Sequence, residues 1–198
     1  MDVSDLFDKS PEDTKLSPEE RIRLATLGCI EELGLKEATV RAIAAKANMN
    51  PAAVNYYFRS KDRLVKEALR GAWSHFAEDV DRIMADNPEP PRAIVLVTRF
   101  LIEGVYRYPR IIRAIIVEHP ALRSEAVSFF NTLFERLTSS GAAGRDPLLG
   151  TTLLFSLGIF FSIDLEAVGV FTDLDLSNFD ARAELSQRLA VMLFGTSA

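Results

Sequence analysis

Residues 39–61 read TVRAIAAKANMNPAAVNYYFRSK, and this stretch decides the fold because it contains two short helical patterns separated by a few turn-forming residues. In the first pattern Thr39 is a good N-cap, and the apolar residues that follow recur on one face of a helix. Asn48 stands where the chain must turn sharply, and asparagine tolerates a left-handed backbone better than most residues. Asn50 can cap a second helix, and Pro51 suits its first turn because its missing N–H would be unpaired there anyway. The spacing predicts two helices joined by a tight turn.

The second helix, from about Pro51 to Tyr57, is expected to present a slim face, while Val54 points toward the core. A helix that enters the major groove of DNA needs a slim face with a few hydrogen-bonding side chains, and asparagine pairs well with adenine there. Ser60 can cap a further helix whose first residue, Lys61, then lies beside a positive helix terminus suited to a phosphate. The pattern favours a DNA-reading helix-turn-helix over a plain helical hairpin. The expected exposed positions of the second helix are Ala52, Ala53, Asn55 and Tyr56.

Positive charge is concentrated in the same part of the chain. The whole sequence has 23 Lys and Arg residues against 28 Asp and Glu residues, a net charge of −5. Residues 36–70 nevertheless hold eight basic side chains against three acidic ones. Because phosphate contacts dominate the affinity of proteins for DNA, this basic segment supports the DNA-binding interpretation. A solvated surface of mixed charge is the alternative.

A denser pattern extends over residues 17–69. Its members are Arg21, Ile22, Ala25, Leu27, Gly34, Thr39, Val40, Arg41, Ile43, Ala44, Ala47, Tyr57, Phe58, Ser60, Lys61, Asp62, Arg63 and Leu64. With this spacing the segment resembles the DNA-binding domain of the TetR (tetracycline repressor-like) family of transcriptional regulators. Two positions depart from the family pattern, because Asn48 replaces the usual glycine of the turn and Arg59 replaces the usual proline before Ser60.

The resemblance implies that Thr39, Tyr57 and Lys61 contact phosphates, and that the exposed positions of the second helix face bases. The complete set of candidate DNA-binding residues is Thr39, Arg41, Asn50, Pro51, Ala52, Ala53, Asn55, Tyr56, Tyr57 and Lys61.

The whole chain is expected to be all-α, because no alternating strand pattern occurs in it. We expect a mobile tail over residues 1–16, a three-helix helix-turn-helix DNA-binding domain over 17–60, and a helical effector-binding and dimerisation domain over 61–198. Start and stop signals support helices at Ser17 to Gly34 and, beyond the motif, from Lys61 to about Ala85. Further helices are expected at about 92–106, after Pro109, after Pro120, at about 147–167 and at about 179–194.

Two late helices predict a homodimer. The helix at about 147–167 has an apolar surface wider than one contact stripe needs, and the helix at about 179–194 carries a second apolar stripe, so two helices from each subunit could form a four-helix bundle. The resemblance implies the same dimer, and two-fold symmetry would place the recognition helices about 34 Å apart on a palindromic operator in double-stranded DNA. The predicted interface residues are Leu153, Leu157, Phe160, Phe161, Leu185, Leu189 and Met192.

The resemblance also implies a small-molecule effector, bound among the remaining helices. The aromatic and imidazole candidates for its site are Trp73, Phe76, Phe100, Tyr106, His119, Phe130 and Phe134, with ordinary core packing of the aromatic residues as the alternative. Glu103 is a further candidate because it interrupts an apolar helix, although Arg99 and Glu103 could instead form a surface i, i+4 pair. Arg107, Arg110 and Arg113 could meet an acidic ligand or simply be solvated.

Other functions are less well supported by the sequence. Asp173, Asp175, Ser177 and Glu184 follow the spacing of a calcium loop, but Asn178 occupies the place of its glycine, and Ser177 or Asp180 is needed as a helix cap. Cys29, His75 and His119 stand in separate helices without a local catalytic or metal motif, so we expect no enzyme, metal or cofactor.

The compartment is expected to be the cytoplasm. The single cysteine can form no internal disulfide, and the first residues are acidic and polar, unlike a secretion signal. The uncharged run 147–163 is expected to be a buried helix and not a membrane span.

The sequence thus predicts a repressor that a small-molecule effector releases from a palindromic operator. The alternative is a DNA-binding dimer whose C-terminal domain only dimerises or binds a protein partner. The identity of the effector and the operator sequence do not follow from the residues.

Overall fold

The computed structural model describes residues 16–139, 156, 159–160, 163 and 165–194. Every regular element in these residues is helical, which confirms the all-α class. The chain divides into two compact units, residues 1–76 and 77–198. Helix α4 (Lys61–Asp86) contributes residues to both units.

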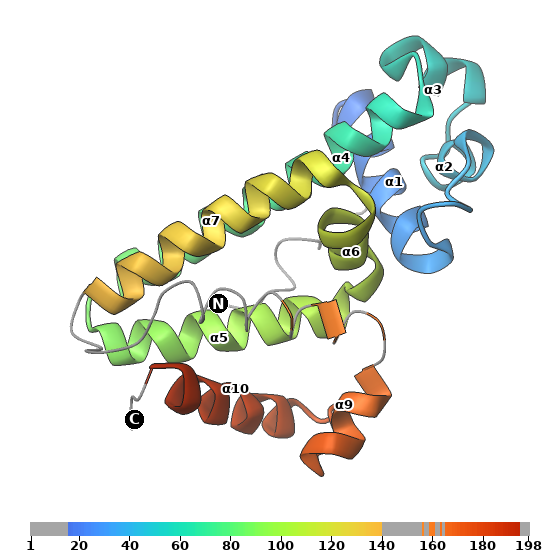
Figure 1. Cartoon of the computed structure of the whole chain (residues 1–198). Coiled ribbons are helices and arrows are strands. Elements are labelled where there is room, and N and C mark those ends of the chain that lie inside the picture. Colours follow the sequence, from blue (N-terminus) through green and yellow to red (C-terminus); the bar gives the residue numbers. More distant parts are fainter. Residues whose placement is uncertain (1–15, 140–155, 157–158, 161–162, 164, 195–198) are drawn as a thin grey trace. The chain divides into compact units, whose positions relative to one another are not determined.

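The first unit contains α1 (Pro18–Leu33), α2 (Val40–Lys46), α3 (Pro51–Phe58) and the first part of α4 (Figure 1). Helix α1 begins with the predicted capping box, in which the Ser17 hydroxyl accepts from the Glu20 N–H at 3.3 Å and the Glu20 carboxylate accepts from the Ser17 N–H at 3.0 Å. It ends at Gly34, whose φ of 86° lies in the region that favours glycine. Both ends of α1 are therefore fixed by residues next to them in the sequence.

Apolar side chains from all four helices form the core of this unit. Helices as short as α2 and α3 are marginal in isolation, so their stability depends on this packing. Cys29 belongs to the same core, and burial raises the pKa of its thiol, with Glu32 adding to the rise and Lys46 opposing it. The fully or almost fully buried residues include Ile22, Ala25, Ile30, Ile43, Ala44, Val54, Phe58, Leu64 and Leu69.

The second unit is built from the remainder of α4 and the helices that follow it. These are α5 (Pro90–Arg107), α6 (Pro109–Arg113), the π-helical turn η2 (Ala114–Glu118), α7 (Pro120–Ser139), α9 (Leu165–Thr172) and α10 (Phe179–Phe194). Helices α5 and α10 lie side by side (Figure 1). Pro109 and Pro120 open helices as predicted.

Two details of this unit differ from the sequence-based expectation. The short helix after Pro109 continues into the π-helical turn η2, in which the carbonyl oxygens of Ile116 and Val117 accept hydrogen bonds from the Arg123 guanidinium. Helix α9 continues past the expected end near residue 167, because the chain leaves the helix only at Asp173, which has a φ of 55°. The returning chain passes close to Gly169, where a Cβ would lie 2.9 Å from the Leu174 carbonyl oxygen.

A buried ion pair joins α5 to α10. The Arg182 guanidinium donates to the two carboxylate oxygens of Glu103 at 2.7 and 3.1 Å, and these residues are 6% and 3% exposed. It also donates to the carbonyl oxygens of Leu176 and Ser177 at 2.9 and 3.0 Å and stands 3.9 Å from the centre of the Tyr106 ring. Arg182 therefore holds α5, α10 and the loop between α9 and α10 together.

The interpretation of Arg99 and Glu103 as a surface pair is wrong. Glu103 is buried against Arg182, which lies 79 residues further along the chain. Arg99 instead stands over the ring of Phe179, 4.4 Å from its centre. The error arose because the i, i+4 spacing is visible in the sequence, whereas a partner on a distant helix is not.

Replacing Arg182 with methionine should lower the free energy of unfolding by up to about 3–5 kcal/mol, because it removes the closer cation from the buried Glu103 carboxylate and leaves, among the described residues, only Arg107, whose Nε lies 3.7 Å away. Replacing both residues, as Glu103→Leu with Arg182→Met, should recover most of this loss. The measurement is urea unfolding followed by circular dichroism. The control is Arg188→Met, which breaks the exposed pair of Arg188 with Glu184 on the same helix and should cost less than about 1 kcal/mol. Equal losses at Arg182 and Arg188 would contradict the role assigned to the buried pair.

Candidate nucleic-acid interface

The turn between α2 and α3 is fixed by side-chain caps and a left-handed residue. The Thr39 hydroxyl accepts from the Ala42 N–H at 3.2 Å at the start of α2, and the Asn50 side chain accepts from the Ala52 N–H at 2.8 Å at the start of α3. Between the helices Asn48 has a φ of 52°, as its position predicted. Thr39 thus fixes the start of α2, while the backbone of Asn48 and the cap at Asn50 set the direction in which α3 leaves the turn.

Helix α3 has one buried and one exposed side. Val54 and Phe58 are 1% and 3% exposed and face the core of the first unit. Ala52, Asn55 and Tyr56 are exposed, and Tyr56 is 80% exposed although it is a large aromatic residue. This side carries small and planar groups with few bulky obstacles, as a helix inserted into a major groove requires.

The other candidate DNA-binding residues fall into two groups. Those with exposed side chains are Thr39, Arg41, Asn50 and Pro51, and those that are half-buried are Ala53, Tyr57 and Lys61. The Tyr57 ring packs edge-on against Tyr56, with 5.3 Å between the ring centres.

Lys61 has an intramolecular role that the sequence did not reveal. Its ammonium donates to the carbonyl oxygens of Leu35 and Lys36 at 3.2 and 3.0 Å, which ties the start of α4 to the segment between α1 and α2. No local signal could have indicated this contact, because it joins residues 25 and 26 positions apart. Lys61 thus supports the structure whether or not it also meets a phosphate.

The basic residues of this unit divide according to whether they have partners. Lys46 pairs with Glu32 at 2.5 Å, Arg63 pairs with Glu67 at 2.7 Å, and Arg21 donates to the Ala47 carbonyl oxygen at 2.7 Å. Among the residues that the structure describes, no partner is found for the side-chain cations of Lys36, Arg41, Arg59 and Lys66. Arg41 and Arg59 belong to the helix-turn-helix itself.

Gly28 makes room for the pair between Lys46 and Glu32. A Cβ at position 28 would stand 2.3 Å from Cε of Lys46, so the lysine side chain lies directly over this glycine. The Lys46 ammonium is therefore paired within the domain, although this lysine is part of the basic segment.

Most of the aromatic candidates for effector binding pack against other side chains. Trp73 stacks on Phe76 with 5.1 Å between ring centres, and Phe100, Phe130 and Phe134 are buried. His119 is half-buried, and its Nδ1 atom is buried without a hydrogen-bond partner among the described residues. Glu103 is held by Arg182, and Tyr106 lies against the same guanidinium.

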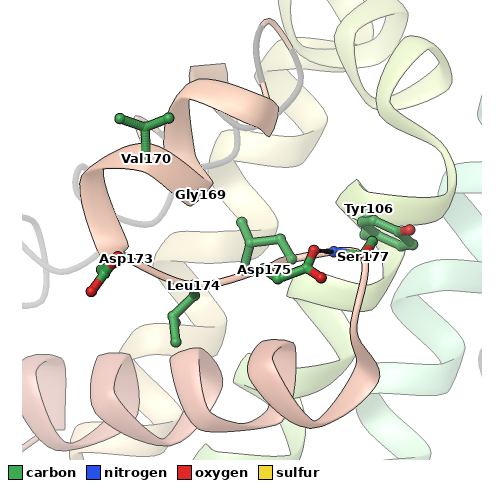
Figure 2. A pocket seen from close by; sticks show the side chains of 8 residues that line it. Tyr106, Gly169, Val170, Asp173, Leu174, Asp175 and Ser177 are labelled. Carbon is green, nitrogen blue, oxygen red and sulfur yellow. Dashed lines mark hydrogen bonds between the residues drawn. The ribbon is translucent and has the colours of Figure 1, made fainter.

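An open hollow of about 610 Å³ lies beside the loop between α9 and α10 (Figure 2). Tyr106 and Ser177 stand near one end of it, and Val170 and Asp173 stand toward the other. Tyr106 is the one effector candidate among its lining residues. The others are Gly169, Val170, Asp173, Leu174, Asp175, Leu176 and Ser177.

The acidic loop beside this hollow is organised by its own hydrogen bonds. Asp175 accepts from the Ser177 hydroxyl at 2.6 Å and from the Ser177 N–H at 3.0 Å, and these bonds hold the pKa of the Asp175 carboxyl below its usual range. The Asn178 side chain caps α10 by accepting from the Asp180 N–H at 2.8 Å, so the expected cap at Ser177 or Asp180 is wrong. Within the described residues no group of three or more His, Cys, Asp or Glu side chains could hold a metal ion.

The predicted dimer-interface residues differ in their surroundings. Leu185 is 5% exposed and packs with Ile102 and Val105 inside its own chain, and Leu189 packs against the same cluster, so little of Leu185 is available to a partner. Phe160 and Met192 are exposed. Other large exposed apolar residues nearby in the sequence are Ile163, Val170 and Val191, which the sequence analysis did not select. Leu153, Leu157 and Phe161 lie outside the described residues.

Among the helices of the described segments, none has the length and apolar character that a membrane crossing requires. Most of the uncharged run 147–163 lies outside those segments.

The family model described as bacterial regulatory proteins, tetR family, matches residues 22–68. The chain is 38% identical over 73 residues to the HTH-type transcriptional regulator BetI of Stenotrophomonas maltophilia, and the match covers 37% of each protein, little more than a third of the relative's length. It is 22% identical over 181 residues to the HTH-type transcriptional repressor NicS of Pseudomonas putida, covering 83% of this chain and 85% of NicS.

A solved structure extends the similarity in fold to nearly the whole chain. The crystal structure of AibR in complex with isovaleryl coenzyme A and operator DNA superposes with a TM-score of 0.68 at 18% identity, covering 91% of this chain and 100% of AibR. At this identity the match establishes the fold. The residues that the family model matches, 22–68, include the helix-turn-helix.

Replacing Lys61 with methionine should lower the free energy of unfolding by about 1–3 kcal/mol in the absence of DNA, because two carbonyl oxygens lose a charged donor. The measurement is denaturant unfolding of the free protein. Lys66→Met is the matched control, since Lys66 is exposed on the same helix and its ammonium has no partner among the described residues. An unchanged stability of Lys61→Met would show that these hydrogen bonds contribute nothing to the fold.

Proposed function

The chain belongs to the tetR family of bacterial regulatory proteins through its helix-turn-helix domain, and on this basis we propose that it is a homodimeric transcriptional regulator that binds a palindromic operator. The observation that carries the proposal is the exposed side of α3, where Asn55 and Tyr56 project from a helix that Val54 and Phe58 anchor. Residues 17–60 are proposed to read the DNA, and residues 61–198 to dimerise and bind the effector. The relatives carry names of regulators, so we propose no enzymatic activity.

Base reading is proposed for the exposed side of α3, and phosphate contact for its flanks. Asn55 can donate to and accept from the edge of an adenine, which is the pairing that asparagine makes in the major groove. Thr39 and Lys61 lie before and after α3, Tyr57 lies in its last turn, and these residues can fix the register of the helix on the backbone of the DNA. One helix of eight residues contacts few base pairs, so two copies on a palindrome are needed for specificity.

Exposed apolar residues support the proposed homodimer. Phe160, Ile163, Val170, Val191 and Met192 leave apolar area uncovered at the carboxyl end of the chain. A second copy of the same surface can cover such area with two-fold symmetry, which also brings two recognition helices to one DNA molecule. The predicted interface residues Leu153, Leu157 and Phe161 remain part of this proposal.

A small-molecule effector is proposed to control the affinity for DNA. The AibR structure, which shares the fold, holds isovaleryl coenzyme A together with operator DNA. Helix α4 runs without interruption from the first unit into the second, so a ligand that prefers one arrangement of α4 would shift the population of DNA-binding conformations.

The alternative function is a regulator without a ligand, whose second unit only dimerises or binds a protein. The burial of Phe100, Phe130 and Phe134 supports this alternative, because ordinary core packing explains these three residues without a ligand.

The direct test is selection of random duplex DNA by the purified protein, followed by binding to the enriched sequence. We expect a palindrome with half-sites about one helical turn apart. Asn55→Ala should weaken binding by about 5- to 100-fold per half-site when the preferred base is present and should relax the preference at that one position of the half-site. Tyr57→Ala should weaken binding to all sequences alike. Equal losses on every sequence for Asn55→Ala would contradict its base-reading role.

Effector control can be tested with the selected operator as the probe. Isovaleryl coenzyme A is the first compound to add, with free coenzyme A as its control, followed by a broad panel of metabolites. A true effector should raise the free energy of unfolding by about 2.7 kcal/mol at a hundredfold excess over its dissociation constant. It should also change operator affinity at the same concentrations. If no compound changes operator affinity, the ligand-free alternative is preferred.

A further inference from the structure

Arg59 lies at the carboxyl end of the recognition helix. Ala52, Asn55 and Tyr56 stand at i, i+3 and i+4 on one face of α3, and Arg59 follows directly after the last residue of the helix. All four side chains are exposed in the structure. An exposed arginine therefore follows directly after the helix that is proposed to meet DNA.

The backbone at Arg59 has an unusual conformation for an arginine. Its φ of 60° lies in the left-handed region, and its N–H donates to the Asn55 carbonyl oxygen at 2.9 Å, so Arg59 ends α3. Glycine or asparagine adopts this conformation more easily. The backbone geometry of the helix end thus gives no reason for an arginine at this position.

The side chain of Arg59 also makes no contact that would explain its charge. In the described part of the chain, its guanidinium has no ion-pair or hydrogen-bond partner, whereas Lys46, Lys61 and Arg63 of the same unit all have one. A cation near a helix C-terminus does interact favourably with the helix dipole, but this effect is small when the residue is exposed. The guanidinium is therefore available to an anion outside the chain.

We propose that Arg59 binds a DNA phosphate in each half-site. The inference rests on the proposed function, in which α3 lies in the major groove. The N-terminal residues of such a helix contact base edges, while its C-terminal end leads toward the sugar-phosphate backbone. A guanidinium can form two parallel hydrogen bonds to phosphate oxygens, which suits this position. Arg59 adds one phosphate contact per subunit to those that the sequence resemblance implies.

The test is the salt dependence of DNA binding by the full-length protein and three variants, Arg59→Gln, Arg59→Lys and Lys66→Gln. Glutamine and lysine must adopt the same left-handed backbone at position 59 as arginine does, at a similar cost in free energy. Neither substitution should therefore change the stability of the end of α3. Lys66→Gln removes an equally exposed and unpartnered charge from α4. Binding is measured by fluorescence anisotropy on the selected operator and on operators with single base changes, from about 50 mM to about 300 mM salt. Thermal melting of each free variant checks that it is folded.

For Arg59→Gln, the slope of log K against log salt should become shallower by about 2, since each phosphate contact contributes about 0.9 and a dimer loses two contacts. Binding should weaken roughly 30-fold at about 0.15 M salt, and by the same factor on every operator variant. Arg59→Lys should keep the slope of the wild type because it keeps the charge. Lys66→Gln should keep it as well. The melting temperatures should all agree.

Three results would overturn the proposal. They are an unchanged slope for Arg59→Gln, an equal change for Lys66→Gln, and a loss confined to operators that differ at one base pair, which would make Arg59 a base reader. Failure of the proposed function looks different, because the wild-type protein would then select no sequence. In that case the slope on a random duplex still decides whether Arg59 contacts phosphate, and a complete absence of DNA binding would refute both ideas.

Discussion

The burial of Val54 and Phe58, on the inner side of α3, is the constraint on which the DNA-binding surface depends. A helix of eight residues is too short to be stable in water by itself, so its order comes from these two anchors and from the caps at its start. The same anchors decide which residues face outward. Because Val54 and Phe58 point inward, Asn55 and Tyr56 must point away from the core, and Tyr56 remains exposed although burial would otherwise be favourable for an aromatic ring. The exposed ring contributes less to the free energy of folding than a buried ring would, and such exposure is typical of a binding surface.

Features that depend on neighbouring residues could be predicted from the sequence. The capping box of α1, the left-handed turn at Asn48 and the cap at Asn50 each involve residues within three positions of one another, and all three are present in the structure. The starts of helices at Pro109 and Pro120 belong to the same class, because proline acts on its own local backbone. The all-α class and the order of the helices followed from these signals together with the apolar spacing.

Features that join distant residues could not be predicted. The pair of Glu103 with Arg182 spans 79 positions, and the sequence instead suggested the local pair with Arg99. The contact of Lys61 with the carbonyl oxygens of Leu35 and Lys36 depends on how the chain folds back, so the sequence allowed only a phosphate role for this lysine. Apolar spacing on α10 likewise did not distinguish Leu185, which packs within its own chain, from Met192, which is exposed. Periodicity identifies an apolar residue, but the surrounding helices decide what covers it.

The charges of the helix-turn-helix domain show why counting basic residues is an incomplete guide to a DNA-binding surface. Lys46, Lys61 and Arg63 all add to the positive balance of the segment, yet each already has a partner inside the protein. A phosphate that approached them would have to compete with that partner, so part of the Coulomb attraction would be offset by the interaction it replaces. Arg41 and Arg59 present no such competition in the described residues. These two guanidinium groups can bind a phosphate without first leaving an internal partner. Cations without an internal partner are therefore the more informative part of the basic segment.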